Sequence, residues 1–586
     1  MKKISIVLSA LALIAGTVSC DELLNLKNPN NQTTYDFGNN ESDLQEAVIA
    51  CYNRIRLEGT FARVGYTMDA VRGDEVWNSS QQWYYGYDCL NIPQDDEIGN
   101  QWIWRDCYHV VNRCNFVLSK VDVANLSDDA YAKIKGQALF LRALAYYTLA
   151  TYYQSVPLFV DYSQYSSIKT MYAENAPQED VFAQIDADLE EAMQLLPSRD
   201  DSNWEKGRAT CGAAAGYYAR SLMFQHRYQE AYAVLKDIIA GTYGHYALVA
   251  DYGDNFAEGD KEYNEESLFE VGYLDYGKGG TDEEWTPVNI SINATQGHAV
   301  ESNYAPAAYG SWADLAISPW LYNLFKAERC TDGTLDPRLY YTAASYEPEY
   351  DSYTGAKTAA YPGGDPRKNV IYQEPVSATP FSNATQGGIA IAKFTYARYD
   401  VCSTIVTGLH CGINLRLMRY SDVLLRAAEC ENELNGPTQT AIDYINQVRN
   451  RVALPGLKLE DFPSKDALFE QIANVERPKE FGCENGRGID LIRWGFFYDQ
   501  GRLDQLMVHG AYVLGTDKDH TQELTPDTWE KSSFQFYAKG HEYFPMATST
   551  LNANPNLTGN SANNNVDNSA EFLAKWSVHP VYDLGK

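Results

Sequence analysis

Apolar side chains recur at the spacing of an α-helix in two long stretches of this chain, residues 41–250 and 415–500. The clearest stripe begins after Ser127, a good N-cap that two acidic residues follow, and it continues to Tyr153 before Pro157 stops it. A helix with one apolar face must bury that face against another element, so the pattern predicts a mainly α-helical fold. The same reasoning predicts further helices over 43–58, 104–115, 177–197, 209–225, 424–434 and 441–448.

The predicted helices follow one another in pairs that combine small and aromatic residues. Small residues such as Ala145 and Ala214 let an aromatic ring of the neighbouring helix approach closely. This arrangement resembles tetratricopeptide repeats, with looser spacing than a regular 34-residue array. We therefore expect a scaffold of helical hairpins.

Residues 251–414 interrupt that scaffold with a different kind of sequence. They are rich in Gly, Asn, Thr, Tyr and Pro and contain only short apolar runs, which favours loops with a few strands. Long irregular insertions in a folded protein usually carry function. We expect one domain over residues 41–586, with a loop-rich insertion at 251–414 and an irregular C-terminal arm at 500–586.

The composition excludes some classes of function. The 586 residues contain 78 Asp and Glu against 47 Lys and Arg, a net charge of −31, which would repel a nucleic acid backbone. The 11 cysteines lack the spacing of a zinc site or redox motif, so most of them are expected to be small buried side chains. No metal site is predicted from the sequence, but a bound Ca²⁺ ion stays open because acidic stretches such as Asp251 to Asp260 lack a defined ligand spacing. Spacing alone leaves any disulfide pairing open.

The first twenty residues have the parts of an export signal. Lys2 and Lys3 precede an apolar run that is shorter than the ~20 residues of a membrane-spanning helix, and small residues follow before Cys20. This segment resembles the lipobox of bacterial lipoproteins, although Thr17 stands where Leu is usual, so residues 1–19 are expected to be removed and Cys20 lipidated. A secreted protein with an unmodified Cys20 is the alternative.

The residues after Cys20 indicate where the protein would be held. The pair Asp21–Glu22 resembles the tag that sends Bacteroidetes lipoproteins to the outside of the outer membrane. Removal of residues 1–19 makes the net charge −33, so acyl chains and not electrostatic attraction must anchor the protein. Residues 20–40 are Asn-rich and are expected to form a flexible leash that spans roughly 25 Å.

Seven sequence blocks resemble the SusD/RagB-like family of Bacteroidetes outer-membrane nutrient-binding lipoproteins, and the match covers nearly the whole mature chain. Gln154 departs from the family by occupying a place usually held by Gly. The blocks, in family order, are LFLRALAYYTLATYYQSVPLF (139–159), PQEDVFAQIDADLEEAMQLLP (177–197), NEESLFEV (264–271), MRYSDVLLRAAECENELNG (418–436), INQVRNRVALP (445–455), VERPKEFGCENGRGIDLIRWG (475–495) and EYFPMATSTLNANPNL (542–557).

The resemblance implies a protein that captures nutrients at the cell surface. It would sit as a lid over a SusC-like TonB-dependent outer-membrane transporter, bind an oligosaccharide or polysaccharide outside the cell and deliver it to the barrel. The implied fold has four tetratricopeptide-like helix pairs as a scaffold, with loop-rich insertions that build the ligand face. No cofactor is implied.

Three arginines of the 475–495 block have a structural interpretation. Arg477, Arg487 and Arg493 lie close in sequence to several carboxylates, and a guanidinium can pair with a carboxylate through two hydrogen bonds. We expect these arginines to hold irregular segments together rather than to bind ligand.

A glycan site needs flat aromatic surface together with side chains that donate and accept hydrogen bonds. Such residues are concentrated in the loops at 72–100 and 285–320, and we expect the two loops to converge on one face. The predicted ligand-binding residues are Arg72, Asp74, Trp77, Trp83, Tyr84, Tyr85, Trp285, Asn289, Tyr304, Tyr309 and Trp312. Trp102 and Trp104 are expected to pack in the core of a helix pair instead.

Three other functions remain open. A surface glycoside hydrolase would need two suitably placed carboxylates, but the chain contains no GxSxG, HExxH, Walker or EF-hand motif, and we expect no enzymatic activity. A protein-interaction scaffold would use the helical repeats alone. The same lid arrangement could also carry a peptide or another nutrient, although the abundance of aromatic residues favours sugar.

Overall fold

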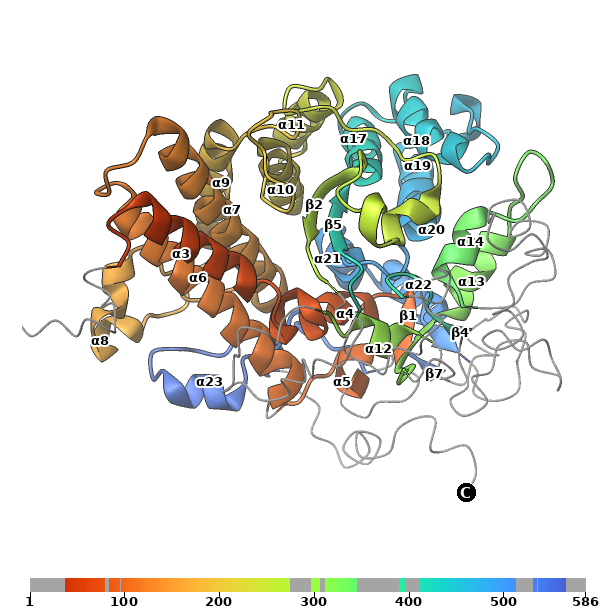
Figure 1. Cartoon of the computed structure of the whole chain (residues 1–586). Coiled ribbons are helices and arrows are strands. Elements are labelled where there is room, and N and C mark those ends of the chain that lie inside the picture. The colour runs from red at the N-terminus through yellow and green to blue at the C-terminus, as the bar shows by residue number, and fades with distance from the viewer. Residues whose placement is uncertain are drawn as a thin grey trace, which may run out of the picture.

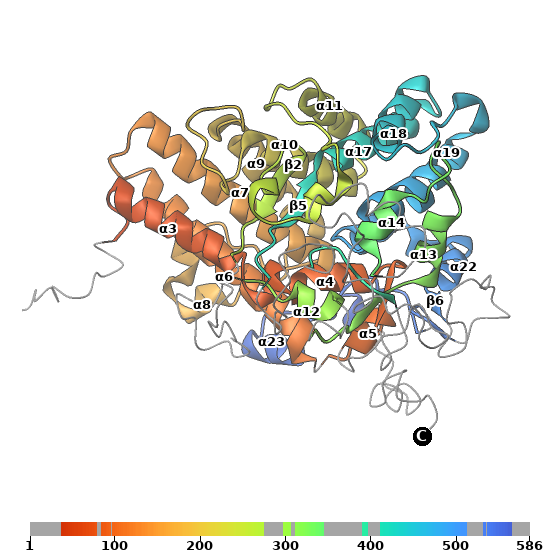
Figure 2. The same cartoon turned by 45° about the vertical axis from the view of Figure 1, so that its right-hand side comes forward.

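Helices dominate the computed structural model, which describes residues 37–78, 84–94, 96–274, 297–305, 311–344, 389–395, 411–512, 531–534 and 536–564. The scaffold helices are α3 (Glu41–Arg54), α6 (Trp102–Val121), α7 (Asp128–Tyr153), α9 (Gln178–Leu195), α10 (Cys211–Phe224), α11 (Tyr228–Ile239), α17 (Tyr420–Asn435) and α18 (Gln439–Arg451). Each packs against its neighbours in a continuous series, from α3 through α6, α7, α9, α10, α11 and α17 to α18. The predicted scaffold of helix pairs is confirmed (Figures 1 and 2).

Local sequence signals explain where these helices begin and end. The hydroxyl of Ser127 accepts a hydrogen bond from the backbone N–H of Ala130 at the start of α7, as an N-cap does. Thr438 caps α18 in the same way, and Gly436 ends α17 with a positive φ of 74°. Gly136 lets α7 and α9 pack closely, since a Cβ at this position would come within 2.9 Å of the side chain of Leu196.

The insertion leaves the scaffold and returns to it at one place. Strand β2 (Ser267–Val271) pairs antiparallel with β5 (Leu415–Arg419), which closes the excursion, and α11 packs directly on α17. The described parts of the insertion contain helices as well as strands, which corrects the prediction of loops with a few strands. These elements are α12 (Val300–Tyr304), β3 (Leu315–Ile317), α13 (Pro319–Lys326), α14 (Pro337–Thr342) and β4 (Ile389–Ala390).

Residues 60–100 and the C-terminal region also contain more regular structure than the sequence indicated. The first region has α4 (Val64–Val71), β1 (Val76–Asn78) and α5 (Tyr85–Asp88), and β1 pairs with β3, which pairs with β4. The C-terminal region forms α22 (Gln500–His509), strands β6 (Ala511–Tyr512) and β7 (Lys531–Ser532), and α23 (Thr548–Ala553). Loops were predicted over 60–100 because the helical period is lost there, and an extended C-terminal arm because of Pro545, Pro555 and an Asn-rich run. The structure forms short helices and strands in both regions.

Short helical segments complete the fold. The α-helices are α8 (Ile168–Met171), α19 (Lys465–Gln471), α20 (Arg477–Phe481) and α21 (Arg487–Arg493). The π-helical segments are η1 (Glu58–Ala62), η3 (Glu97–Gln101) and η10 (Ile472–Glu476). The 3₁₀ segments are η4 (Tyr162–Ser166), η5 (Tyr252–Phe256), η6 (Gly259–Lys261), η9 (Leu459–Asp461), η11 (Phe496–Tyr498) and η12 (Ala562–Asn564).

The nine cysteines within the described residues are all buried, as expected of small apolar side chains. None of the helices in the described ranges combines the length and apolar character that a membrane crossing requires.

Candidate ligand-binding site

The two loop regions that the sequence singled out meet in the structure. Strand β1 pairs antiparallel with β3, so that Trp77 lies opposite Ala316. The Tyr84 hydroxyl donates a hydrogen bond to Oδ1 of Asn303 at 3.3 Å. The short elements α4, α5, α12 and β1 accordingly lie together below the scaffold in Figure 1. The predicted convergence is confirmed for the described parts of both regions.

Most of the predicted ligand-binding side chains in this area are buried, which corrects the expectation that they form an open platform. Each is at most 2% exposed because it belongs to the packed interior beneath the loops. They are Arg72, Asp74, Trp77, Tyr84, Tyr85 and Tyr304. An aromatic ring covered on both faces has no face left for a sugar.

Two of these residues have structural partners that explain their position. The guanidinium of Arg72 lies 4.3 Å from the ring centroid of Phe544 and donates to the backbone carbonyl of Glu542, so it joins α4 to the C-terminal region. Asp74 accepts two hydrogen bonds from Arg487, at 2.7 and 2.8 Å. Their charges serve packing between distant segments.

The remaining predicted residues divide into two groups. Trp83, Trp285, Asn289 and Tyr309 lie outside the described residues, as does Cys20. Trp312 is described and half-buried, so part of its indole is accessible to solvent.

Trp312 belongs to a small aromatic and cationic cluster at the surface. The Arg63 guanidinium lies 5.6 Å from the ring of Trp312 and 6.0 Å from the ring of Trp102, which is also half-buried. Arg105 lies 5.9 Å from the same Trp102 ring. These distances are within the range of attractive cation–π contacts. The cluster brings together η1, the start of α6 and the insertion.

Two π-helical segments shape this cluster. Segment η3 runs directly into α6 at Trp102, and η1 packs against α6. Only glycine fits at Gly59, because a Cβ there would lie 2.1 Å from the carbonyl oxygen of Trp102. The backbone N–H of Gly59 donates to Asp106 at 3.0 Å, and that of Ala299 donates to the carbonyl of Ala62 at 2.8 Å. π-helical segments are often found at functional sites.

The charges around the cluster are fixed by ion pairs. Nε of Arg63 donates to Glu58 at 2.8 Å, and Nε of Arg105 donates to Asp106 at 2.6 Å. Burial raises the pKa of Glu58 above its usual value even though Arg63 opposes that shift. The result is a pair of half-buried indoles, Trp102 and Trp312, packed on a buried guanidinium that cannot itself reach a ligand. Trp102 and Trp104 pack against the apolar core, which confirms the prediction for both, although each stays partly exposed. Arg63 could not be singled out from sequence, because its contacts with the two indoles depend on the folded chain.

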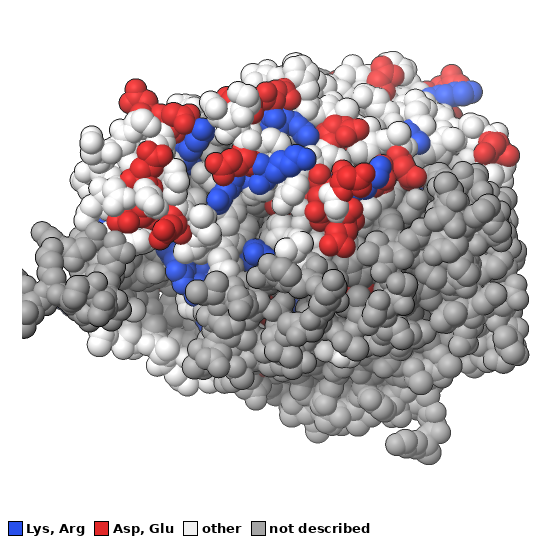
Figure 3. All heavy atoms as spheres, in the orientation of Figure 1, with Lys and Arg blue, Asp and Glu red and all other residues white. Residues whose placement is uncertain are grey.

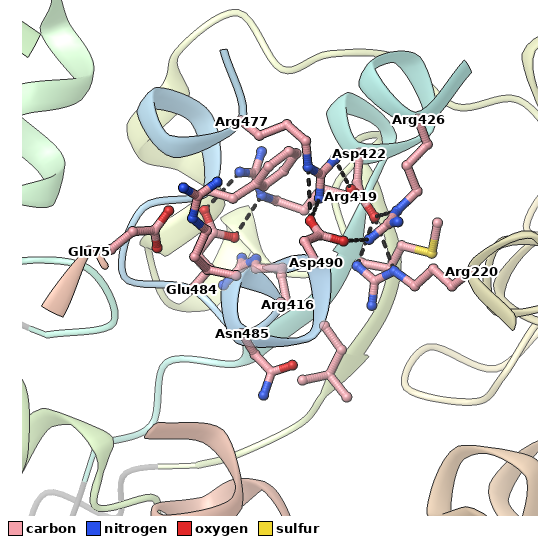
Figure 4. A pocket seen from close by; sticks show the side chains of 15 residues that line it. Glu75, Arg220, Arg416, Arg419, Asp422, Arg426, Arg477, Glu484, Asn485 and Asp490 are labelled. Atoms are coloured by element: carbon pink, nitrogen blue, oxygen red, sulfur yellow. Dashed lines mark hydrogen bonds and ion pairs between the residues drawn. The ribbon is translucent and has the colours of Figure 1, made fainter. Parts of the chain in front are cut away.

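A highly charged cavity within the described residues is structural. It lies among α17, α20, α21 and β5, and it holds only about 20 Å³, little more than one water molecule. Figure 4 shows the Arg477 guanidinium between Asp422 and Asp490, with distances of 2.8 and 2.6 Å. Arg493 pairs with Glu429 at 2.8 Å. With the Arg487–Asp74 pair, these contacts confirm that the three arginines of the block 475–495 hold segments together.

No group of three or more His, Cys, Asp and Glu side chains that could hold a metal ion occurs in the part of the chain that the structure describes. The partly exposed rings of Trp102 and Trp312 and the partly exposed Arg105 side chain offer aromatic surface and a hydrogen-bond donor, which suits recognition of a ligand.

The architecture defines a class of protein, a helical-repeat scaffold with long insertions between and beyond the repeats. Residues 265–563 match the family model described as "SusD family", and residues 22–223 match one described as "Starch-binding associating with outer membrane". The chain belongs to the SusD family.

Relatives and solved structures agree with this assignment. The chain is 24% identical over 516 residues to SusD-like protein P25 of Formosa agariphila, which covers 85% of this chain and 91% of that protein. A SusD superfamily protein from Bacteroides vulgatus superposes with a TM-score of 0.66 at 24% identity, covering 90% and 100% of the two chains. Surface glycan-binding protein A from Bacteroides thetaiotaomicron, solved in complex with laminarihexaose, gives a TM-score of 0.62 at 21% identity, covering 89% and 100%.

Proposed function

We propose that this protein is a cell-surface lipoprotein that captures an oligosaccharide or polysaccharide and delivers it to a SusC-like TonB-dependent outer-membrane transporter. Membership of the SusD family and a fold shared with a protein solved in complex with laminarihexaose support a glycan as the ligand. The protein would bind the glycan without changing its covalent structure.

The observation that carries this proposal is the pair of half-buried indoles, Trp312 of the insertion and Trp102 at the start of α6, which pack on the buried Arg63 guanidinium. A sugar ring presents a face of C–H groups that stacks on an indole, and hydroxyl groups at its edge that bond to charged side chains. The residues Trp83, Trp285, Asn289 and Tyr309, which belong to the same two loop regions, are proposed to extend this surface.

An open surface of this kind binds modestly, with dissociation constants between about 1 mM and 1 µM, or about −4 to −8 kcal/mol. Modest affinity suits delivery, because differences in affinity are mostly differences in dissociation rate. Nanomolar binding would hold the cargo too long for repeated transfer to a transporter.

The site of attachment follows from the N-terminal sequence. Lipidation of Cys20 would anchor the mature chain in the outer membrane, facing the exterior, and residues 21–40 would connect it to α3. The leash is long enough to let the scaffold move over a transporter while the lipid stays in place.

The first test is a polysaccharide array probed with the soluble form, residues 21–586. Binding to one or a few glycans is the expected result, with no increase in reducing ends after incubation. New reducing ends would show a hydrolase and contradict the proposal. Binding to peptides but to none of the glycans would show that the same arrangement carries another nutrient.

A further inference from the structure

A second hollow lies in the scaffold, away from the loop site. It has a volume of about 380 Å³ and is bounded by α3, α7 and residues 196–209, which join α9 to α10. Its floor is apolar, with Val48, Ile134 and Leu196 all buried. Its rim is polar and consists of Glu41, Gln45, Asp129, Lys133, Asn203, Glu205 and Arg208. A hollow of this size falls within the range of small-ligand sites.

Trp204 forms one wall of the hollow. The indole is half-buried, and its Nε1 donates to the backbone carbonyl of Arg208 at 2.9 Å. This bond uses the edge of the ring and fixes its orientation, so the bond leaves the faces of the ring available for stacking. The Arg208 side chain is held as well, with its guanidinium 4.9 Å from the ring centroid of Tyr52.

Gln137 places an unsatisfied acceptor in the same hollow. Its Nε2 donates to the carbonyl of Lys133 at 2.9 Å, but its buried Oε1 accepts no hydrogen bond in the described structure. Buried acceptors are nearly always satisfied in proteins. The oxygen has no exposed surface in the unliganded hollow, so a ligand hydroxyl would supply the missing donor after a turn of the Gln137 side chain.

The charges on the rim select against an ionic ligand. Nζ of Lys133 pairs with Asp129 at 2.8 Å, and Nε of Arg208 lies 3.6 Å from a carboxylate oxygen of Glu205. Both cations therefore have a carboxylate partner on the same rim. A phosphate or sulfate would meet the carboxylates, and an ammonium ion would meet the cations. Acidic and basic side chains lie beside one another over the end of the molecule that α3 and α9 form (Figure 3).

We propose that this hollow is a second saccharide-binding site. Its apolar floor and the Trp204 ring would receive the C–H faces of a sugar, and the amides, carboxylates and the Gln137 acceptor would bond its hydroxyls. The choice of ligand class rests on the proposed function, but the site uses none of the same residues.

Two sites on one chain would change how the protein discriminates among glycans by length. A polysaccharide that reaches both sites binds the second one intramolecularly, at an effective concentration set by the span between the sites. Binding of the polysaccharide would then exceed binding of its hexasaccharide by at least tenfold, and loss of either site would remove that advantage.

The test is ¹⁹F NMR of residues 21–586 labelled with 5-fluorotryptophan, in which the Trp204→Phe variant assigns the Trp204 resonance. The probes are hexasaccharides of glucose, mannose, xylose and galactose, each titrated to about 10 mM to cover the expected affinity range. At least one probe should shift the Trp204 resonance saturably. The dissociation constant read from this shift should be unchanged in Trp312→Ala and should rise about tenfold in Gln137→Leu. Lys206→Ala, an exposed change in the same segment, serves as the control that leaves the shift intact.

If no tryptophan resonance shifts with any probe, neither site binds these saccharides and both the second site and the proposed function are wrong. If other tryptophan resonances respond and Trp204 stays silent with every probe, the second site is wrong and the proposed function stands. If the Trp204 resonance shifts and Trp312→Ala leaves every other saccharide-induced shift unchanged, the second site stands and the loop site is wrong. A Trp204 resonance that ignores all saccharides but shifts with a purified transporter overturns the saccharide assignment in favour of a protein contact.

Discussion

Asp74 offers a sharp test of whether a buried charge in the loop region serves the fold or the ligand. Its carboxylate is fully buried and accepts two hydrogen bonds from Arg487 and one from Nδ1 of His509, at 2.8 Å. Burial alone would raise the pKa of Asp74, but the guanidinium of Arg487 and the imidazole of His509 outweigh burial and hold the pKa well below its usual range. We predict that Asp74→Asn destabilises the protein and leaves glycan binding by the folded protein unchanged.

The size of the effect follows from the geometry. Removing one partner of a buried ion pair leaves the other charge unpaired and costs about 3–5 kcal/mol. With an unfolding entropy of about 2.1 cal/mol/K per residue, roughly 550 residues give about 1.2 kcal/mol/K, so the cost corresponds to a fall in Tm of about 3–4 °C if the chain unfolds cooperatively. Replacing both partners, in Asp74→Leu with Arg487→Met, should recover much of this loss because no charge is then left buried.

Thermal unfolding at several pH values is the appropriate assay. Because the folded pKa of Asp74 lies below the unfolded value of about 3.9, its stabilisation is present above that pH and is lost as the pH falls toward the folded pKa. The difference in Tm between wild type and Asp74→Asn should therefore shrink in acid. An unchanged Tm together with lost glycan binding would refute the structural role and restore Asp74 as a ligand group.

Three further predictions address other parts of the protein. Burial raises the pKa of Glu75 from 4.5 to about 8, so the wild type should lose stability as the pH rises from 4.5 toward 8 and level off above it, whereas Glu75→Gln should lack this loss. Parallel Tm curves between about pH 5 and pH 8 would contradict this. Ser127→Ala removes the N-cap of α7 and should lower the free energy of unfolding by about 1 kcal/mol in denaturant titrations, and a change below about 0.3 kcal/mol would count against the cap. Cys20→Ala in the full-length chain should abolish incorporation of labelled fatty acid and release the protein from the membrane fraction; continued labelling would show that another residue carries the lipid.

The helical scaffold could be predicted from sequence because its signals are local. The Ser127 cap, the stripe of α7 and the Gly436 stop each act within a few residues, and the structure places helices where these signals occur. The short helices of the insertion, such as α13, escaped prediction since they span only two turns and depend on tertiary packing.

The candidate site could be predicted only in part. Aromatic content indicated correctly which two regions of the chain come together, as the pairing of β1 with β3 shows. It did not reveal which rings face solvent, because exposure depends on partners hundreds of residues away, such as the carbonyl of Glu542 for Arg72. The core packing of Trp102 was predicted correctly, but its partial exposure beside the π-helical entry into α6 was not.

The most direct test of the central claim is isothermal titration of residues 21–586 with the best glycan from the array, compared with the variant Trp312→Ala. The control is Trp104→Ala, which removes a half-buried indole of α6 whose ring centroid lies 5.1 Å from that of Tyr153. Each stacked ring contributes on the order of 1–2 kcal/mol, so Trp312→Ala should weaken binding about tenfold or more, and the control should bind as the wild type does. Equal binding by wild type and Trp312→Ala, with both proteins folded, would contradict the account.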